Sequence, residues 1–170
     1  MKLGQPKWTR RLPRALVVGA ATLGPLGARL PAPGTWGSLA GLLYFAVFFP
    51  GLSPLAYLLL VLLGIYLSIA LCGEAEIRLG RTDPGEVILD EFISMPLCFL
   101  GYASLLHSMP RWAVLLGGFG LFRLFDILKP LGIRRLQVLP GGWGVTVDDL
   151  AAALAACASL HLLAHFWSRL

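Results

Sequence analysis

The sequence has little charge and little cysteine for its length. Only 14% of its 170 residues are charged and 57% are hydrophobic, which is far from the composition of an average soluble domain. A soluble domain of this size could not bury so much apolar surface, so a membrane is the simpler solvent for it. Cys72, Cys98 and Cys157 form no Cys-x-x-Cys pair and lie in apolar stretches. The sequence therefore predicts neither a disulfide framework nor a zinc site.

Acidic residues are also scarce, and all nine lie between Glu74 and Asp149. The N-terminus is basic instead, and we expect residues 1–23 to lie partly in the interface, with Trp8 at headgroup level. Such a segment indicates the anionic cytoplasmic leaflet of a bilayer. No basic surface interleaved with aromatic residues is visible, so we expect no nucleic-acid partner. The length favours one domain over residues 1–170 and predicts no oligomeric state. The basic residues of this N-terminal segment are Lys2, Lys7, Arg10, Arg11 and Arg14.

The apolar runs predict an all-α, polytopic membrane helical bundle, because a spanning helix needs about 20 mostly apolar residues. Proline and glycine predict loops over residues 24–38 and 130–147. Lysine and arginine concentrate on the side of the N-terminus, which the positive-inside rule assigns to the cytosol. This orientation brings the acidic motifs to the cytosolic face. The expected helical runs are a short Leu39–Phe49, then Leu55–Cys72, Phe92–Leu106 continuing an acidic helix, Trp112–Leu128 and Leu150–Trp167.

The stretch from Asp83 to Glu91 holds four carboxylates in nine residues. Asp83 before Pro84, with Glu86 three residues on, favours a helix start with a capping box. A helix beginning there places Asp83, Glu86 and Asp90 on one face, with Glu91 beside them. Carboxylates on one face repel each other unless a cation lies between them, and Mg²⁺ prefers oxygen ligands. The alternative is a solvated helix start with no ligand.

Arg123, Asp126 and Lys129 follow one another at three-residue steps near the end of an expected span. The two cations could bind a phosphoryl group while Asp126 joins a metal site. The alternative is an ion pair at a helix end, with Lys129 complementing the helix dipole. Asp148 and Asp149 precede the last expected span, where they could supply a second acidic wall or simply cap the helix.

The segment from Pro33 to Ser38 reads Pro-Gly-Thr-Trp-Gly-Ser and leads into the helical run that starts at Leu39. Its glycines, the hydroxyls of Thr35 and Ser38, and the N–H groups of a helix start could hold a phosphate. The simpler alternative is that Ser38 is the N-cap of the next helix, and spacing alone favours it.

Two further patterns have metal-binding or catalytic spacing. His161 and His165 stand at i and i+4, but no acid lies near them in the last span, so packing is favoured over metal binding. Cys72 and Arg78 match the Cys-x₅-Arg spacing of phosphatases that use a thiolate. Two glutamates within that loop would oppose thiolate formation, and an apolar helix rather than a strand precedes Cys72. A thiolate mechanism is therefore disfavoured.

Three blocks together resemble the phosphatidylglycerophosphatase A family, magnesium-dependent lipid phosphatases of the bacterial inner membrane. The resemblance spans about residues 24–160 and implies hydrolysis of phosphatidylglycerophosphate to phosphatidylglycerol and phosphate. Ser94 and Gly132 stand where the family usually has glycine and proline. Neither is a charged position, so they affect local packing and substrate preference more than the chemistry. The blocks are Pro33–Ser38; Asp83-Pro84 with Asp90-Glu91; and Phe122–Pro130 with Gly141–Val145 and Asp148-Asp149.

This resemblance implies a role for each motif, with water as the nucleophile because no side chain looks activated. The expected Mg²⁺ ligands are Asp83, Glu86, Asp90, Glu91, Asp126, Asp148 and Asp149. The expected catalytic residues are Asp83, Asp90, Glu91, Asp126, Arg123 and Lys129. The expected substrate-binding residues are Thr35, Ser38, Arg123, Lys129 and Arg134. The alternative function is non-enzymatic transport or sensing of divalent cations, which the lack of a mid-span acid disfavours.

Overall fold

The protein is built from helices, as the composition predicts. The computed structural model describes residues 4–130 and 132–169, and those ranges contain no strand. Lys2, part of the basic N-terminus, lies outside the described residues. The elements in chain order are η1 (Trp8–Arg11), α1 (Arg14–Ala21), α2 (Pro25–Arg29), α3 (Pro33–Phe48), α4 (Pro54–Leu79), α5 (Leu89–Ser94), η2 (Met95–Phe99), α6 (Tyr102–Ser108), α7 (Arg111–Leu128), η3 (Ile133–Val138) and α8 (Gly142–Trp167).

The helices α4 and α8 are each 26 residues long and apolar enough to cross a membrane. The hydroxyl of Ser53 caps α4 at its start, and Gly80 ends it in the left-handed conformation with φ +68°. These two helices confirm the runs expected at Leu55–Cys72 and Leu150–Trp167. The helix α7 has three charged residues among its 18 and is not among the helices found apolar enough to cross a membrane. That α7 spans the membrane therefore stays a prediction.

The run Phe92–Leu106, expected as one continuous helix, is broken. It comprises the end of α5, the 3₁₀ turn η2 and most of α6, and α5–η2 meets α6 at a bend of 58°. Pro96 lies in η2 and has no N–H for an α-helical hydrogen bond, while Gly101 has φ +73°. If this bent pair is one span, the described chain has three helical segments able to cross a membrane.

Two helices begin earlier than the sequence predicts. Residues 24–38 are not a loop, because α2 lies within them and α3 starts at Pro33, a residue suited to the first helical position. The helix α8 starts at Gly142, so Asp148 and Asp149 lie within the helix instead of capping it. A methyl group at Gly142 would lie 1.9 Å from the carbonyl oxygen of Ile69 on α4, so this glycine permits close helix packing.

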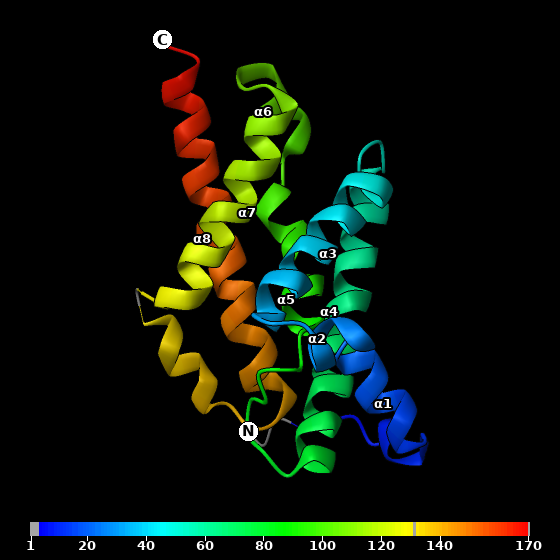
Figure 1. The fold of residues 1–170 in the computed structure, drawn as a ribbon. Coiled ribbons are helices and arrows are strands. Elements are labelled where there is room, and N and C mark those ends of the chain that lie inside the picture. The colour runs from blue at the N-terminus through cyan, green and yellow to red at the C-terminus, as the bar shows by residue number, and fades with distance from the viewer. Residues whose placement is uncertain (1–3, 131, 170) are drawn as a thin grey trace.

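Every acid-bearing segment lies toward one end of the bundle (Figure 1). The α3–α4 turn, the α6–α7 turn and the C-terminus lie at the opposite end, at the top of the view. The helix α8 packs against α4 and α7, and α5 packs against α3. The sequence-based expectation that the acidic motifs share one end of the molecule is therefore confirmed.

The interior is aromatic, and the outer faces of the long helices are aliphatic. Phe45 of α3 is fully buried and stacks on Phe99 of η2, with ring centroids 4.3 Å apart. Exposed leucines run along the outer face of α4, as expected for contact with lipid tails. They are Leu55, Leu58, Leu59, Leu62 and Leu63.

Replacing Phe45 by alanine should lower the stability of the folded protein strongly, because it empties a stacked aromatic core. We expect a loss of about 3–5 kcal/mol in the free energy of unfolding. Phe48→Ala on the same helix is the matched control, since that ring is 59% exposed and should change little. Thermal unfolding of both variants in detergent measures the difference, and equal losses would contradict the assignment of Phe45 to the core.

Candidate active site

Arg123 on α7 connects three helices through one nitrogen atom. Its Nη1 donates to Asp126 Oδ2 at 2.7 Å, to Ser38 Oγ at 3.3 Å and to Glu91 Oε1 at 3.4 Å. Asp126 lies on α7, Ser38 on α3 and Glu91 on α5. All four side chains are buried or nearly so. The helices that carry the three sequence motifs therefore meet at this guanidinium.

Arg123, Ser38, Glu91 and Asp126 form a cluster, and Lys129 connects it to α8. Its ammonium group hydrogen bonds to Asp148 and lies 3.6 Å from Asp126 Oδ1, so Asp126 is held between two cations. Burial alone would lower the pKa of Lys129, but the hydrogen bond to Asp148 and the charges of Asp149, Asp148 and Asp126 outweigh it. The net result is a pKa above the ordinary value for lysine, so Lys129 stays cationic at physiological pH.

The glycines at the start of α3 make room for Glu91. A methyl group at Gly34 would lie 2.1 Å from Glu91 Oε1, and one at Gly37 would lie 2.9 Å from Glu91 Oε2. Ser38, one turn after Gly34, donates its hydroxyl to the Gly34 carbonyl at 2.8 Å and accepts from Arg123. The motif is therefore a helix start shaped around a carboxylate and not the open loop that its glycines predict.

The buried acidic cluster consists of Glu91, Asp126, Asp148, Asp90 and Asp149. Their residues are 5% and 3% exposed, and Asp148 is 2% exposed. Asp149 lies within electrostatic range of Asp90, Asp126, Glu91 and Asp148. Within the described ranges, neither Asp90 nor Asp149 forms an ion pair with a lysine or arginine. The negative charge of the cluster thus exceeds what Arg123 and Lys129 supply.

Several polar atoms of this cluster are buried without a hydrogen-bond partner from the protein. They are Glu91 Oε2, Asp148 Oδ1 and Arg123 Nε. A buried carboxylate oxygen without a donor is costly, so such atoms are expected to contact water, a cation or a ligand. Carboxylate oxygens are the donor set that Mg²⁺ prefers, and the residues present therefore fit that ion in charge and in chemistry. Among the described residues, no three such side chains already converge as a ligand set.

Asp83 does not begin a helix, and that prediction was wrong. It has φ +47°, which a right-handed helix excludes, and α5 begins only at Leu89. Asp83, Glu86 and Asp90 therefore do not share one helix face. The Asp83 N–H donates to Glu76 Oε1 at 2.6 Å, and Asp83 Oδ2 accepts from Gln137 at 3.2 Å. Exposed at the edge of the cluster, Asp83 still lies within electrostatic range of Asp90.

Three other residues expected in the site lie outside the cluster. Glu86 pairs with Arg81 on the same loop. Thr35 is exposed on the first turn of α3, and Arg134 is exposed on η3. Within the part of the chain that the structure describes, none of the three has a hydrogen bond or ion pair to the cluster. Their binding roles stay predictions.

Sequence reasoning missed Glu76 and Gln137, the two residues that hold Asp83. Glu76 lies in the last turns of α4, beyond the run Leu55–Cys72 expected to span, and Gln137 lies in η3, where a loop was expected. Gln137 is distant in sequence from the acidic motif, whereas Glu76 precedes Asp83 by seven residues. Only their polarity in an apolar chain could have pointed to them.

The two disfavoured patterns have other roles. His161 Nε2 hydrogen bonds with the carbonyl of Leu100 at 2.8 Å, which agrees with packing rather than metal binding. Cys72 is fully buried within α4, and its Sγ lies 3.7 Å from Ser68 Oγ. Arg78 bonds to Glu74 at 2.8 Å and to the carbonyls of Leu12 and Thr9. Arg78 is thus a structural clamp for the N-terminal segment.

The chain is similar in sequence to known proteins. The family model described as Phosphatidylglycerophosphatase A matches residues 19–164. The chain is 37% identical to the Phosphatidylglycerophosphatase A of Haemophilus influenzae over 127 residues, which is 74% of this chain and 75% of that protein. It is 33% identical to the protein of the same name from Escherichia coli K12 over 138 residues, 79% of this chain and 76% of that one.

A third relative carries a different name. It comes from Bacteroides thetaiotaomicron, is provisionally named a phosphatidylinositol-3-phosphatase, and is 36% identical over 129 residues, 72% of this chain and 77% of that protein. No solved structure matches the chain.

Replacing Arg123 by glutamine should destabilise the protein, because it leaves Glu91 and Asp126 buried with less compensating charge. The expected loss is about 3–5 kcal/mol, the range for breaking a buried ion pair from one side. Arg111→Gln at the exposed start of the same helix is the matched control. Chemical unfolding in detergent measures both, and an Arg123 variant as stable as the Arg111 variant would show that this contact is not structural.

Proposed function

The chain belongs to the phosphatidylglycerophosphatase A family, and on this premise we propose that it hydrolyses phosphatidylglycerophosphate to phosphatidylglycerol and phosphate with Mg²⁺. Membership makes it a phosphatase, which decides against the alternative of cation transport or sensing. The observation that carries the proposal is the junction at Arg123, where carboxylates from α5 and α7 and the hydroxyl of Ser38 on α3 surround one guanidinium.

Hydrolysis of a phosphomonoester requires groups that bind an anion and spread its charge. Arg123 and Lys129 are the two cations of the cluster, and guanidinium and ammonium groups are the usual protein ligands of phosphate. Both are bound to carboxylates here, so a substrate phosphate would compete with Asp126, Glu91 and Asp148 for them. Ser38 offers its hydroxyl oxygen to the same guanidinium and would help to position it.

Mg²⁺ is proposed because it would remove that competition. The carboxylates that would hold it are Asp90 and Asp149, which have no cationic partner in the described chain, with Glu91 and Asp148, which each keep one buried oxygen free. Asp83 lies at the edge of the acidic cluster, within electrostatic range of Asp90. When bound, Mg²⁺ neutralises carboxylates and polarises a phosphoryl oxygen.

Water is the proposed nucleophile. Nucleophilic side chains become reactive beside a base or in an electropositive setting. The Cys72 thiol is instead fully buried within α4 beside the Ser68 hydroxyl, near the carboxylates of Asp90 and Asp149 and, among the described residues, not near a cation. Ser38 is held by Gly34 and Arg123. A carboxylate of the cluster that does not bind the ion would accept the proton that water loses.

The proposed location is the cytosolic side of a bacterial inner membrane. Lys129, Arg78 and Arg81 lie on the segments that carry or flank the acidic cluster, whereas Arg111 lies near the α6–α7 turn at the opposite end (Figure 1). This bias follows the positive-inside rule. With the reaction at that face, the acyl chains of the lipid stay in the bilayer beside the aliphatic faces of the helices.

The metal proposal predicts that phosphate release from phosphatidylglycerophosphate in detergent stops in EDTA and returns with added Mg²⁺. Asp90→Asn should lower turnover at least about 100-fold, because it removes a charge proposed to hold the ion. Glu86→Gln is the matched control and should stay within a few-fold of wild type, since Glu86 pairs with Arg81 on the loop. Full activity in EDTA would refute the metal proposal, and phosphatidylinositol 3-phosphate as a second substrate would test the headgroup preference.

Cys72→Ser separates the water mechanism from a thiolate mechanism. The variant should keep near-wild-type turnover, because serine fills the same buried position and can hydrogen bond to Ser68. Phosphate release is the measurement, and retained thermal stability shows that the variant folds. A folded Cys72→Ser protein without activity would contradict hydrolysis by water.

A further inference from the structure

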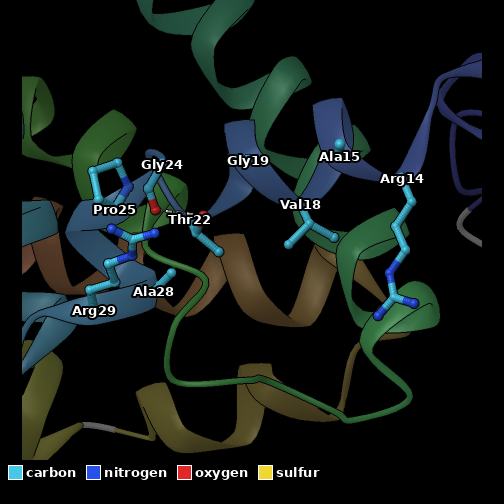
Figure 2. A pocket seen from close by; sticks show the side chains of 9 residues that line it. All are labelled: Arg14, Ala15, Val18, Gly19, Thr22, Gly24, Pro25, Ala28 and Arg29. Atoms are coloured by element: carbon cyan, nitrogen blue, oxygen red, sulfur yellow. Dashed lines mark hydrogen bonds between the residues drawn. The ribbon is translucent and has the colours of Figure 1, made fainter.

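A pocket of about 710 Å³ opens on α1 and α2, apart from the acidic cluster. Its floor is apolar and small, formed by Ala15 and Val18 of α1 and Ala28 of α2. Figure 2 shows Arg14 and Arg29 at opposite ends of this floor. The pocket is open to its surroundings and not enclosed.

The two arginines lack any acidic compensation in the described chain. Both are exposed, neither forms an ion pair there, and no carboxylate lines the pocket. Solvated arginines are common on protein surfaces. Arg14 and Arg29 differ from such solvated arginines because an apolar floor lies between them. Water solvates an apolar surface poorly. A ligand that complements both features carries a negative group and a hydrocarbon chain.

The pocket lies beside segments suited to the membrane interface. Trp8 of η1, just before α1, donates its indole N–H to Tyr66 Oη at 2.8 Å, and tryptophan and tyrosine are enriched at headgroup level. Leu16 on α1 is 60% exposed. The helix α1 packs along α4, which is long and apolar enough to cross the membrane. These neighbours favour a position near the membrane interface, where lipid phosphates and the first methylene groups lie.

We propose that this pocket binds an anionic phospholipid of the surrounding bilayer, with its phosphate held by the arginine at one end of the pocket and an acyl chain over the apolar floor. The site goes beyond the proposed hydrolysis. It contains none of the residues of the acidic cluster, and without a carboxylate it offers no group to activate water. The bound lipid is therefore a ligand that stays intact.

The pocket is coupled to the acidic cluster through α2. A methyl group at Gly27 would lie 2.2 Å from the carbonyl oxygen of Glu86, so α2 rests directly on the loop that carries Asp83. Arg29 ends α2 four residues before Pro33, which begins α3. A lipid that bridges α1 and α2 would hold this connection in place and stabilise the folded protein.

The test measures binding of acyl-labelled fluorescent phosphatidylserine to the full chain in mixed micelles of phosphatidylcholine and detergent. Phosphatidylserine is anionic but is neither the proposed substrate nor the proposed product. Arg14→Gln with Arg29→Gln should weaken binding at least about tenfold, because the pocket then has no cation at either end to hold the phosphate. Arg10→Gln with Arg11→Gln removes the same charge outside the pocket and should stay within about twofold.

A steric pair of variants tests the floor independently of charge. Val18→Trp fills the pocket and should weaken binding, while Leu16→Trp on the exposed face of α1 should not. Thermal unfolding confirms that each variant is folded. Equal effects of the two arginine pairs, no effect of Val18→Trp, or equal binding of labelled phosphatidylcholine would each overturn the proposal.

Measuring hydrolysis of phosphatidylglycerophosphate in micelles without phosphatidylserine tests whether this site is separate from the route by which the substrate reaches the acidic cluster. The Arg14 and Arg29 double variant should turn over substrate in neutral micelles as wild type does. A loss of turnover there, matching the loss of lipid binding, would place the two arginines on the substrate path and overturn a separate lipid site.

Discussion

The buried guanidinium of Arg123 is the contact on which the arrangement of the helices depends. Burying a charge is expensive unless opposite charges and hydrogen bonds surround it. Here the compensation comes from α3, α5 and α7, and Lys129 brings in α8. The helices must approach closely to supply it, so Gly34 and Gly37 leave space for Glu91. Electrostatics therefore sets the packing here, whereas the aromatic core sets it farther from the cluster.

This dependence explains which features the sequence could predict. In a chain with so few charges, each acid or base within an apolar stretch is informative, because an ionisable group is retained there only at a cost. The segments around Glu91, Arg123 and Asp148 were therefore found and correctly expected at one end of the bundle. Their mutual contacts could not be predicted, since helix spacing says nothing about which faces meet.

Two of the errors have one physical cause, which is the ambiguity of glycine and proline. Both residues break helices in isolation, yet Pro33 starts α3 and Gly142 starts α8. Gly142 is needed because Ile69 of α4 approaches its backbone, and that contact is invisible in the sequence. The error at Asp83 is the opposite one, because a helix start was predicted there and none exists. Asp-Pro favours a helix start, but Glu76 and Gln137 hold Asp83 in a left-handed conformation instead.

The acidic cluster and the pocket on α1 and α2 lie differently with respect to the part of the chain that matches the family model. The acidic cluster lies wholly within residues 19–164, the part that matches the family model. The pocket on α1 and α2 straddles that boundary, since Arg29 lies inside it and Arg14 lies before it. The residues proposed for hydrolysis therefore lie in the part of the chain that matches the family model, while the proposed lipid site includes Arg14, which lies outside it. Substitutions in the pocket therefore need not change the acidic cluster, because the pocket contributes no group to it.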